Sequence, residues 1–203
     1  ETLTGSTPYR QVIIHQKLVH LHLTRSPDLA TAEVEAQQAL FHAETFAANV
    51  EEFKGELQAA RALYTRALAI AESIADNSGL LAAGYSHLGM VLLKIGDLDL
   101  AIDYIRRGLE LSEQRGDTVG PLYDRINLAY ALTVQGRFEA AEELAVDGLA
   151  VAERMHHAYL IAGLSAAAGD AVFRKGALDL AEAHALRSLL QEEEYFRPWA
   201  LTV

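Results

Sequence analysis

Two short motifs contain residues that could carry chemistry, but neither motif is complete. The segment Gly84–Gly89 has the glycine spacing of a phosphate-binding loop. Met90 and Val91 follow it, however, where that loop needs a lysine and then a serine or threonine. Ser165 follows Gly163 at the spacing of a nucleophile elbow, without the second glycine or the preceding strand. We therefore expect neither nucleotide binding nor hydrolysis at these positions.

Histidines are the other candidates for chemistry, because imidazole is a common metal ligand and general base. His15, His20 and His22 form the densest group, yet no single helix or strand would place all three on one face. No carboxylate is interleaved with them, and the His-Glu-x-x-His and EF-hand patterns are missing. We expect no metal site, no cofactor and no catalytic residue, so the protein is predicted not to be an enzyme.

The composition favours helical packing over site chemistry. The 203 residues are 51 % hydrophobic and 22 % charged, with no cysteine and a formal charge of -11. The lack of cysteine excludes a disulfide scaffold, and the acidic balance disfavours nucleic acid as a partner. Apolar runs are far shorter than the ~20 residues that cross a bilayer, so no membrane association is expected. We expect a protein of the cytoplasm.

Glycines recur at a nearly constant interval along the chain. Gly55, Gly96, Gly136 and Gly176 are 41, 40 and 40 residues apart. A small residue stands seven positions before each glycine, and an alanine stands five positions after it. These residues are Ala48, Gly89, Ala129 and Gly169, and then Ala60, Ala101, Ala141 and Ala181. A glycine with a positive φ ends one helix and lets the next fold back, so each copy is expected to be a helical hairpin that stacks on its neighbours.

The repeated positions resemble the tetratricopeptide repeat over about residues 40 to 194. The second unit carries the signature spacing in Leu88, Gly89, Leu92, Gly96, Leu98, Ala101, Ile105 and Gly108. The period near 40 exceeds the 34 of the common form, and we expect the extra residues near the turns between units. HEAT and armadillo repeats have longer periods, but the Gly-x-Leu-x-x-Ala pattern argues against them.

The resemblance implies an all-α fold, a right-handed α-solenoid of stacked hairpins. We expect an N-terminal lead-in over residues 1–27, within which 8–24 could be helix or strand. A stub of a truncated fifth repeat is expected over 196–203. The four hairpins between them are expected at 28–78, 79–118, 119–157 and 158–195. Since Ser26 and Pro27 form a helix start and no breaker precedes Gly55, the first helix should have about 26 residues.

In tetratricopeptide arrays the first helix of each unit lines a concave groove, and the resemblance implies which positions face it. These positions vary between the units, whereas the packing positions do not. The Asn127 amide could hold an extended peptide backbone, and Lys94 and Arg174 could hold carboxylates. The predicted partner-binding residues are Asn49, His87, Met90, Lys94, Tyr123, Asn127, Tyr130, Asp170 and Arg174.

The sequence therefore predicts a scaffold or sensor module that binds a protein or peptide. Its long period and its Gly116-Asp117 turn resemble sensor arrays of bacterial signalling NTPases and transcription activators. Because the sequence starts at Glu1, we expect a fragment of a larger bacterial regulatory protein. One alternative is a free-standing adaptor or peptide receptor, and another is an enzyme that uses His87 and Asp170 in the groove. The expected truncation would leave an apolar end face that could mediate self-association.

Overall fold

The computed structural model describes the backbone of residues 29–74 and 77–200, and the side chains of residues 31–74 and 77–191. The expected lead-in over 1–27, with its histidine group and its Ser26 cap, lies outside these residues, as does the end of the expected stub.

The described residues form eight helices and no strand. The helices are α2 (Leu29–Phe53), α3 (Leu57–Ser73), α4 (Ser78–Ile95), α5 (Leu98–Gln114), α6 (Gly120–Val134), α7 (Phe138–Arg154), α8 (Ala158–Arg174) and α9 (Leu178–Ala200). The all-α class is thereby confirmed. The long first helix is confirmed as well, since α2 has 25 residues and no glycine or proline interrupts it.

A glycine in the left-handed region terminates the first helix of every hairpin. Gly55, Gly96, Gly136 and Gly176 have φ angles between 82° and 97°. Nothing lies within 4 Å of the position that a Cβ would take at any of the four. Their small size is therefore needed for the backbone conformation and not for packing.

The small residues predicted inside each hairpin do lie at close helix contacts. Ala60, Ala101 and Ala141 are fully buried. A Cβ added at Gly89 would lie 2.6 Å from Cγ1 of Ile105 and 3.1 Å from the carbonyl oxygen of Ala101. α4 and α5 thus approach each other more closely at Gly89 than any larger residue would allow.

The extra residues of the long period lie in the helices, and the expectation of long turns between units is wrong. The second helices α3, α5 and α7 each have 17 residues. The turns between units that the structure describes in full are residues 115–119, between α5 and α6, and residues 155–157, between α7 and α8. Turns this short cannot contain an excess of about six residues over the 34-residue repeat. Longer helices bury a longer apolar stripe, which stabilises each stacking interface.

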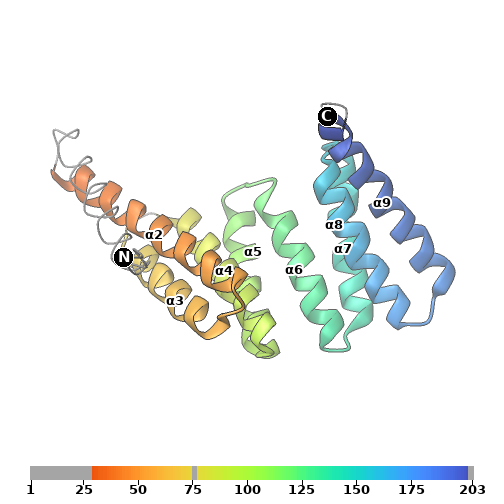
Figure 1. Ribbon diagram of the computed structural model, residues 1–203, viewed down its shortest axis with the longest axis horizontal. Helices are drawn as coiled ribbons and strands as arrows, with labels where there is room; N and C mark the ends of the chain where they lie inside the picture. Colours follow the sequence, from red (N-terminus) through yellow and green to blue (C-terminus); the bar gives the residue numbers. More distant parts are fainter. Residues whose placement is uncertain (1–28, 75–76, 201–203) are drawn as a thin grey trace, which may run out of the picture.

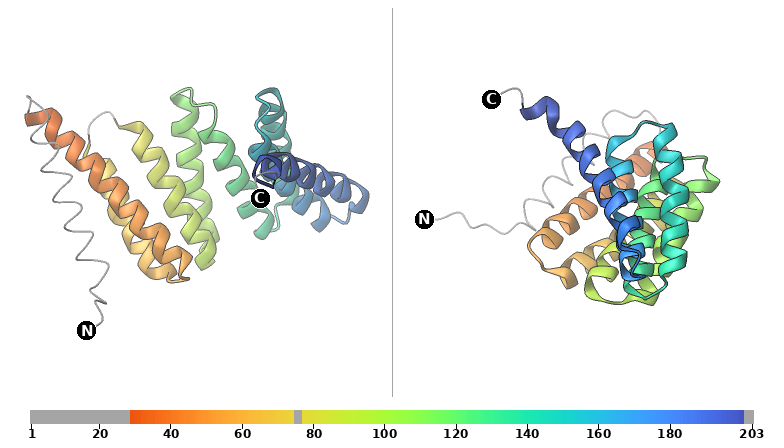
Figure 2. Two further views of the ribbon diagram at one scale, coloured as in Figure 1. Left: turned by 45° about the horizontal axis from the view of Figure 1, so that its top comes forward. Right: turned by 90° about the vertical axis from the view of Figure 1, so that its right-hand side faces the viewer.

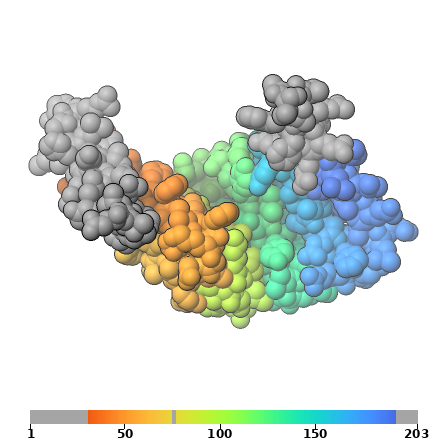
Figure 3. Space-filling model, viewed as in Figure 1, coloured from red at the N-terminus to blue at the C-terminus, as the bar shows by residue number. Residues whose placement is uncertain are grey.

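The helices follow one another in a single elongated array (Figure 1). α2, α4, α6 and α8 contact one another across successive hairpins. Within the part of the chain that the structure describes, α3, α5, α7 and α9 do not contact one another. We call the first set the inner helices and the second set the outer helices. Because the inner helices contact one another across units and the described outer helices do not, the array is bowed, as the turned views and the space-filling view show (Figures 2 and 3).

α4 is the one described helix long and apolar enough to cross a membrane by length and composition alone. In the structure its residues Leu88, Val91 and Leu92 are buried in the shared core of the array. The apolar character of α4 is therefore explained by its packing against α3 and α5.

α9 continues without a break to Ala200. From the sequence, the fourth unit is expected to end at residue 195 and a new unit to begin at 196. The helix does not end there, so the expected turn between a fourth unit and a fifth is missing. The remaining division into hairpins stays a prediction.

Candidate functional site

The inner helices α4 and α6 border a cleft of about 360 Å³. Four of the nine predicted partner-binding residues line it, namely His87, Met90, Tyr123 and Asn127. These residues are far apart in sequence but meet because α4 and α6 are adjacent inner helices. The cleft is the place where the predicted residues come together most densely.

The cleft and its surroundings carry a polar amide and several aromatic rings. The Asn127 side chain is half-buried in the cleft. Its amide has no hydrogen-bond partner among the described residues. The ring of Tyr123 lies 5.8 Å from that of Tyr159 on α8, at a tilt of 43°. Tyr130, one turn beyond Asn127 on α6, has 51 % of its surface exposed. An amide that can both donate and accept, next to exposed aromatic rings, suits an extended peptide.

The His87 side chain packs against a neighbouring helix at the edge of the cleft. Its ring is stacked on that of Tyr64, with centroids 5.5 Å apart and an angle of 11°. Burial lowers the pKa of His87, and the charge of Glu52 opposes this only in part. Its Nδ1 is buried without a hydrogen-bond partner in the described structure. The imidazole is therefore neutral near pH 7 and is not oriented by a carboxylate as a general base would be.

Two further predicted residues are engaged with neighbouring helices. The Tyr64 hydroxyl lies 2.5 Å from Oδ1 of Asn49 and 2.8 Å from Oε2 of Glu52. The Nζ of Lys94 pairs with the other oxygen of Glu52. Burial, and then the hydrogen bond to Glu52, raise the pKa of the Tyr64 phenol. Asn49 and Lys94 thus help to join α2, α3 and α4, a role that their spacing did not indicate.

Asp170 and Arg174 lie apart from the cleft. Nε of Arg174 is 3.4 Å from Oδ1 of Asp170, one helical turn away on α8. Asp170 lines a different pocket, formed by α8 and α9. The structure does not bring His87 and Asp170 into one pocket, so an enzyme that uses both lacks the required geometry.

A buried carboxylate in the cleft was missed from the sequence. Asp124 on α6 is only 4 % exposed and lines the cleft beside Tyr123. Its pKa is raised to about 6, chiefly by burial and also by the charge of Asp117, while the hydrogen bond with Ser86 lowers it. The sequence carries a signal for it, since the other units have an apolar or small residue twelve positions before the turn glycine. Those residues are Ala43, Gly84 and Leu164.

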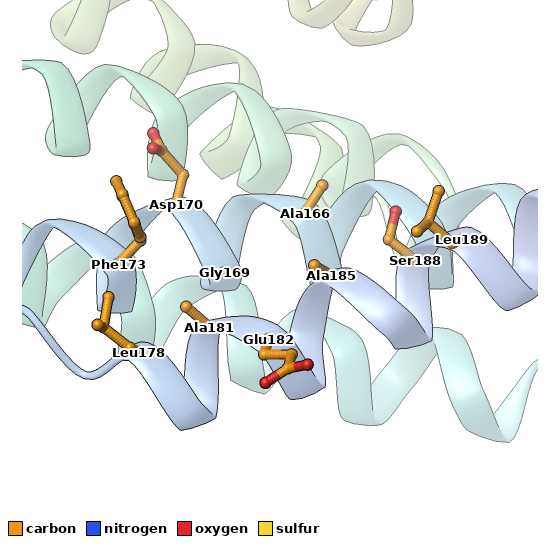
Figure 4. Close-up of a pocket in the computed structure, with 10 residues that line it drawn as sticks. All are labelled: Ala166, Gly169, Asp170, Phe173, Leu178, Ala181, Glu182, Ala185, Ser188 and Leu189. Carbon is orange, nitrogen blue, oxygen red and sulfur yellow. The ribbon is translucent and has the colours of Figure 1, made fainter.

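The end of the array carries an apolar groove of about 620 Å³ between α8 and α9. Its floor consists of small residues, including Gly169, Ala181 and Ala185. Phe173 and Leu178 lie side by side at one end and Leu189 at the other, and all three are more than half exposed (Figure 4). Elsewhere in the array such a surface is covered by the next inner helix. Among the residues that the structure describes, none covers it here.

No group of histidine, aspartate and glutamate side chains among the described residues could hold a metal ion.

Helical hairpins that stack in a row, each in contact with the next, form a helical-repeat solenoid. Two family models described as tetratricopeptide repeat match residues 40–114 and 125–156 of the sequence. Together these matches cover more than half of the chain, which therefore belongs to the tetratricopeptide repeat family. The matches decide against HEAT and armadillo repeats. A search of curated proteins gives no match.

Solved structures share the fold at low sequence identity. BtubC (BKLC) from P. vanneervenii is 21 % identical, with a TM-score of 0.73 over 94 % of this chain and 75 % of that one. A putative kinesin light chain of Podosopora anserina with nearly identical TPR-like repeats is 15 % identical, with a TM-score of 0.63 over 92 % and 87 %. The Rap conjugation gene regulator of plasmid pLS20, in complex with the Phr* peptide, is 16 % identical, with a TM-score of 0.66. The comparison with Rap covers 89 % of this chain but only 52 % of that one.

Proposed function

We propose that the protein is a non-catalytic binding module that receives a protein segment or peptide on its inner helices. The observation that carries this proposal is the cleft between α4 and α6, where four predicted groove residues meet and the Asn127 amide has no partner among the described residues. A groove lined by an amide and aromatic rings can hold a peptide backbone without a defined secondary structure. The solved Rap complex supports it, because a repeat array of the same fold is there bound to a peptide.

Exposed aromatic side chains on another inner helix extend this proposed surface. Phe46 and Phe53 on α2 are 68 % and 94 % exposed, and they are seven residues apart, so they share one helix face. Large apolar side chains exposed in a row are typical of surfaces that bind partners. We expect the bound segment to extend from the cleft toward α2.

We propose further that the module works as a sensor or scaffold in a larger bacterial regulatory protein of the cytoplasm. This rests on the resemblance of its long repeats to sensor arrays and on the fact that it spans about half the length of the Rap regulator. A free-standing adaptor is the alternative. The domain composition of the parent gene separates the two, because a neighbouring NTPase or DNA-binding domain supports a sensor and a gene ending with the array supports an adaptor.

The double variant Asn127→Ala with Tyr130→Ala tests the binding proposal. Selection of a displayed library of random dodecapeptides against the wild type should yield binders, and the double variant should bind them about tenfold more weakly or worse. Val146→Ala on the outer helix α7 is the matched control, because Val146 is exposed on the opposite side. Circular dichroism should show equal helicity in all three. Unchanged affinity in the double variant would move the site away from the inner helices.

A second function, self-association, is favoured by one observation. The groove between α8 and α9 exposes Phe173, Leu178 and Leu189 around a floor of small residues (Figure 4). We propose that a second copy of the chain covers this groove, because exposed apolar surface of this size is unfavourable in water.

A further inference from the structure

Asp124 places a carboxylate where the other repeats have packing residues. Its counterparts Ala43, Gly84 and Leu164 have no ionisable group. At 4 % exposure, an ionised carboxylate has lost most of its contact with water. This loss is costly unless charged or hydrogen-bonding partners replace the water. The packing of the third repeat does not need this charge, so its presence calls for another reason.

The protein supplies Asp124 with little compensation. Its side-chain partner is the Ser86 hydroxyl on α4. That hydroxyl also lies 2.9 Å from the carbonyl oxygen of Ala82 and donates to it. A hydroxyl has one proton, so it cannot donate to the carbonyl and to the carboxylate at once. The salt bridges of the described residues do not include Asp124.

The other charged groups around the cleft do not neutralise Asp124. Asp117 accepts hydrogen bonds from two backbone N–H groups at the start of α6 and stays ionised, because these bonds lower its pKa. The charge of the Arg115 guanidinium also lowers the pKa of Asp117. The guanidinium packs against Gly79, where an added Cβ would lie 2.3 Å from Nη1 of Arg115. His87 is neutral near pH 7 because burial lowers its pKa. With Asp124 ionised, the cleft therefore has a net negative charge.

A buried acceptor whose one side-chain donor is shared with a backbone carbonyl, at the wall of an open cleft, is suited to a cation from outside. We propose that the cleft between α4 and α6 binds an ammonium or guanidinium group on the Asp124 carboxylate, and that a basic side chain of the bound peptide supplies it. This inference rests on the proposed function of the inner helices as a peptide surface.

The arrangement on α6 gives the two residues separate tasks. Asp124 and Asn127 are three positions apart, so they lie on the same face of α6, and both line the cleft. Asn127 can hold the peptide backbone while Asp124 receives the side chain. A guanidinium can present two parallel N–H donors to a carboxylate, which replaces the donors that burial removed. The formal charge of -11 also favours a basic partner.

The same displayed dodecapeptide library tests the proposal. Selection on the wild type should enrich lysine and arginine at one position, and selection on Asp124→Asn should lose that enrichment. Asp147→Asn removes an exposed carboxylate from the outer helix α7 and is the matched control, so it should select as the wild type does. Binders without a basic preference, or the same preference in Asp124→Asn, would overturn the role of Asp124 and leave the peptide surface intact.

A selected peptide and its neutral analogue then measure the pairing directly. Replacing the selected arginine by citrulline should weaken binding to the wild type about tenfold or more, and should have little effect on Asp124→Asn. Affinity of the wild type should also rise between pH 5 and pH 7.5, because Asp124, with a pKa raised to about 6, ionises in that range. Equal citrulline effects in both proteins would exclude Asp124 as the acceptor.

Titration with small cations tests whether Asp124 binds a cation independently of whether the protein binds a peptide. Propylguanidinium and butylammonium are titrated into the wild type, Asp124→Asn and Asp147→Asn, with binding followed by NMR. If no peptide binds, but the cations bind to the wild type and not to Asp124→Asn, then Asp124 is confirmed as the cation acceptor and the proposed peptide function fails. If neither peptides nor cations bind, both are overturned. Asp124→Leu, which copies Leu164 of the fourth repeat, is a second variant should Asp124→Asn fold poorly.

Discussion

At the scale of residues, the third repeat differs from its neighbours because it combines a cleft with a buried charge. Tyr123, Asp124 and Asn127 occupy adjacent turns of α6, and the first and last of them are at predicted groove positions. Asp124 is at a packing position, where a polar side chain lowers stability. A residue that lowers stability and is not needed for packing is best explained by binding.

The cost of Asp124 should be measurable as a pH-dependent difference in stability. Its pKa in the folded protein is raised from 3.8 to about 6, so between these values the folded state binds more protons than the unfolded state. The stability contributed by the protonated form is therefore present at pH 4 and lost as the pH rises through 6. Asp124→Asn, which does not titrate, should be more stable than the wild type by about 2 kcal/mol at pH 7.5 and nearly equal at pH 4.

Urea unfolding at the two pH values checks this expectation. Asp147→Asn serves as the control, because Asp147 is exposed and its removal should give the same small difference at both pH values. A constant difference between Asp124→Asn and the wild type would mean that Asp124 is not titrating in a buried site.

At the scale of elements, close contacts within the hairpins depend on small residues at fixed positions. A Cβ at Gly89 would lie 2.6 Å from the Ile105 side chain and 3.1 Å from backbone atoms of α5. A Cβ at Gly169, the equivalent position in the last hairpin, would meet its nearest atom, Cβ of His184, at 3.2 Å. The two glycines thus share a position in the repeat but differ in the space around them.

This difference predicts opposite effects of one substitution. Gly89→Ala should lower the free energy of unfolding by about 1 kcal/mol, because the strain of overpacking exceeds the gain in helix propensity. Gly169→Ala should leave it unchanged or raise it by up to about 1 kcal/mol, because α8 can shift by a few tenths of an ångström. Thermal and urea unfolding of both variants measure this. A loss in Gly169→Ala as large as in Gly89→Ala would contradict the difference in spacing.

The turns between hairpins use different residues for one purpose. Gly116 after α5 and His156 after α7 both have positive φ angles, of 71° and 53°. His157, next in the chain, is the N-cap of α8, where its Nδ1 accepts a hydrogen bond from the backbone N–H of Leu160 at 3.4 Å. His156 and His157 thus form a turn and a helix cap.

At the scale of the whole molecule, stacking buries one face of each hairpin, and no residue that the structure describes covers the last face. The groove between α8 and α9 is lined by the same kinds of residue that the next inner helix covers elsewhere in the array. If a second copy covers it, the wild type should sediment faster at high protein concentration than at low concentration. Leu178→Lys with Leu189→Lys should sediment as a monomer at both, because two charges would then face the apolar floor.

Val146→Lys is the control for this prediction, since Val146 is exposed on an outer helix away from the groove. It should associate as the wild type does. A wild type that stays monomeric at both concentrations would rule out the second copy as the occupant.

The repeat architecture could be predicted from the sequence because its causes are local. The turn glycines, the small residues and the apolar stripe recur every 40 residues, and each copy encodes one hairpin that must stack. The resemblance to the tetratricopeptide repeat predicted which positions face inward. It could not indicate which of those side chains are already engaged, as Asn49 and Lys94 are with Tyr64 and Glu52.

Sequence alone therefore determined the fold class and the hairpin turns, since backbone conformation and periodicity follow from neighbouring residues. Only the tertiary structure decided that His87 and Asn127 share a cleft, that Asp170 lies elsewhere, and that Asp124 is a buried carboxylate beside Ser86. These facts depend on the distance between α4 and α6. That distance is set by the packing of whole side chains between hairpins, and burial and pKa follow from it.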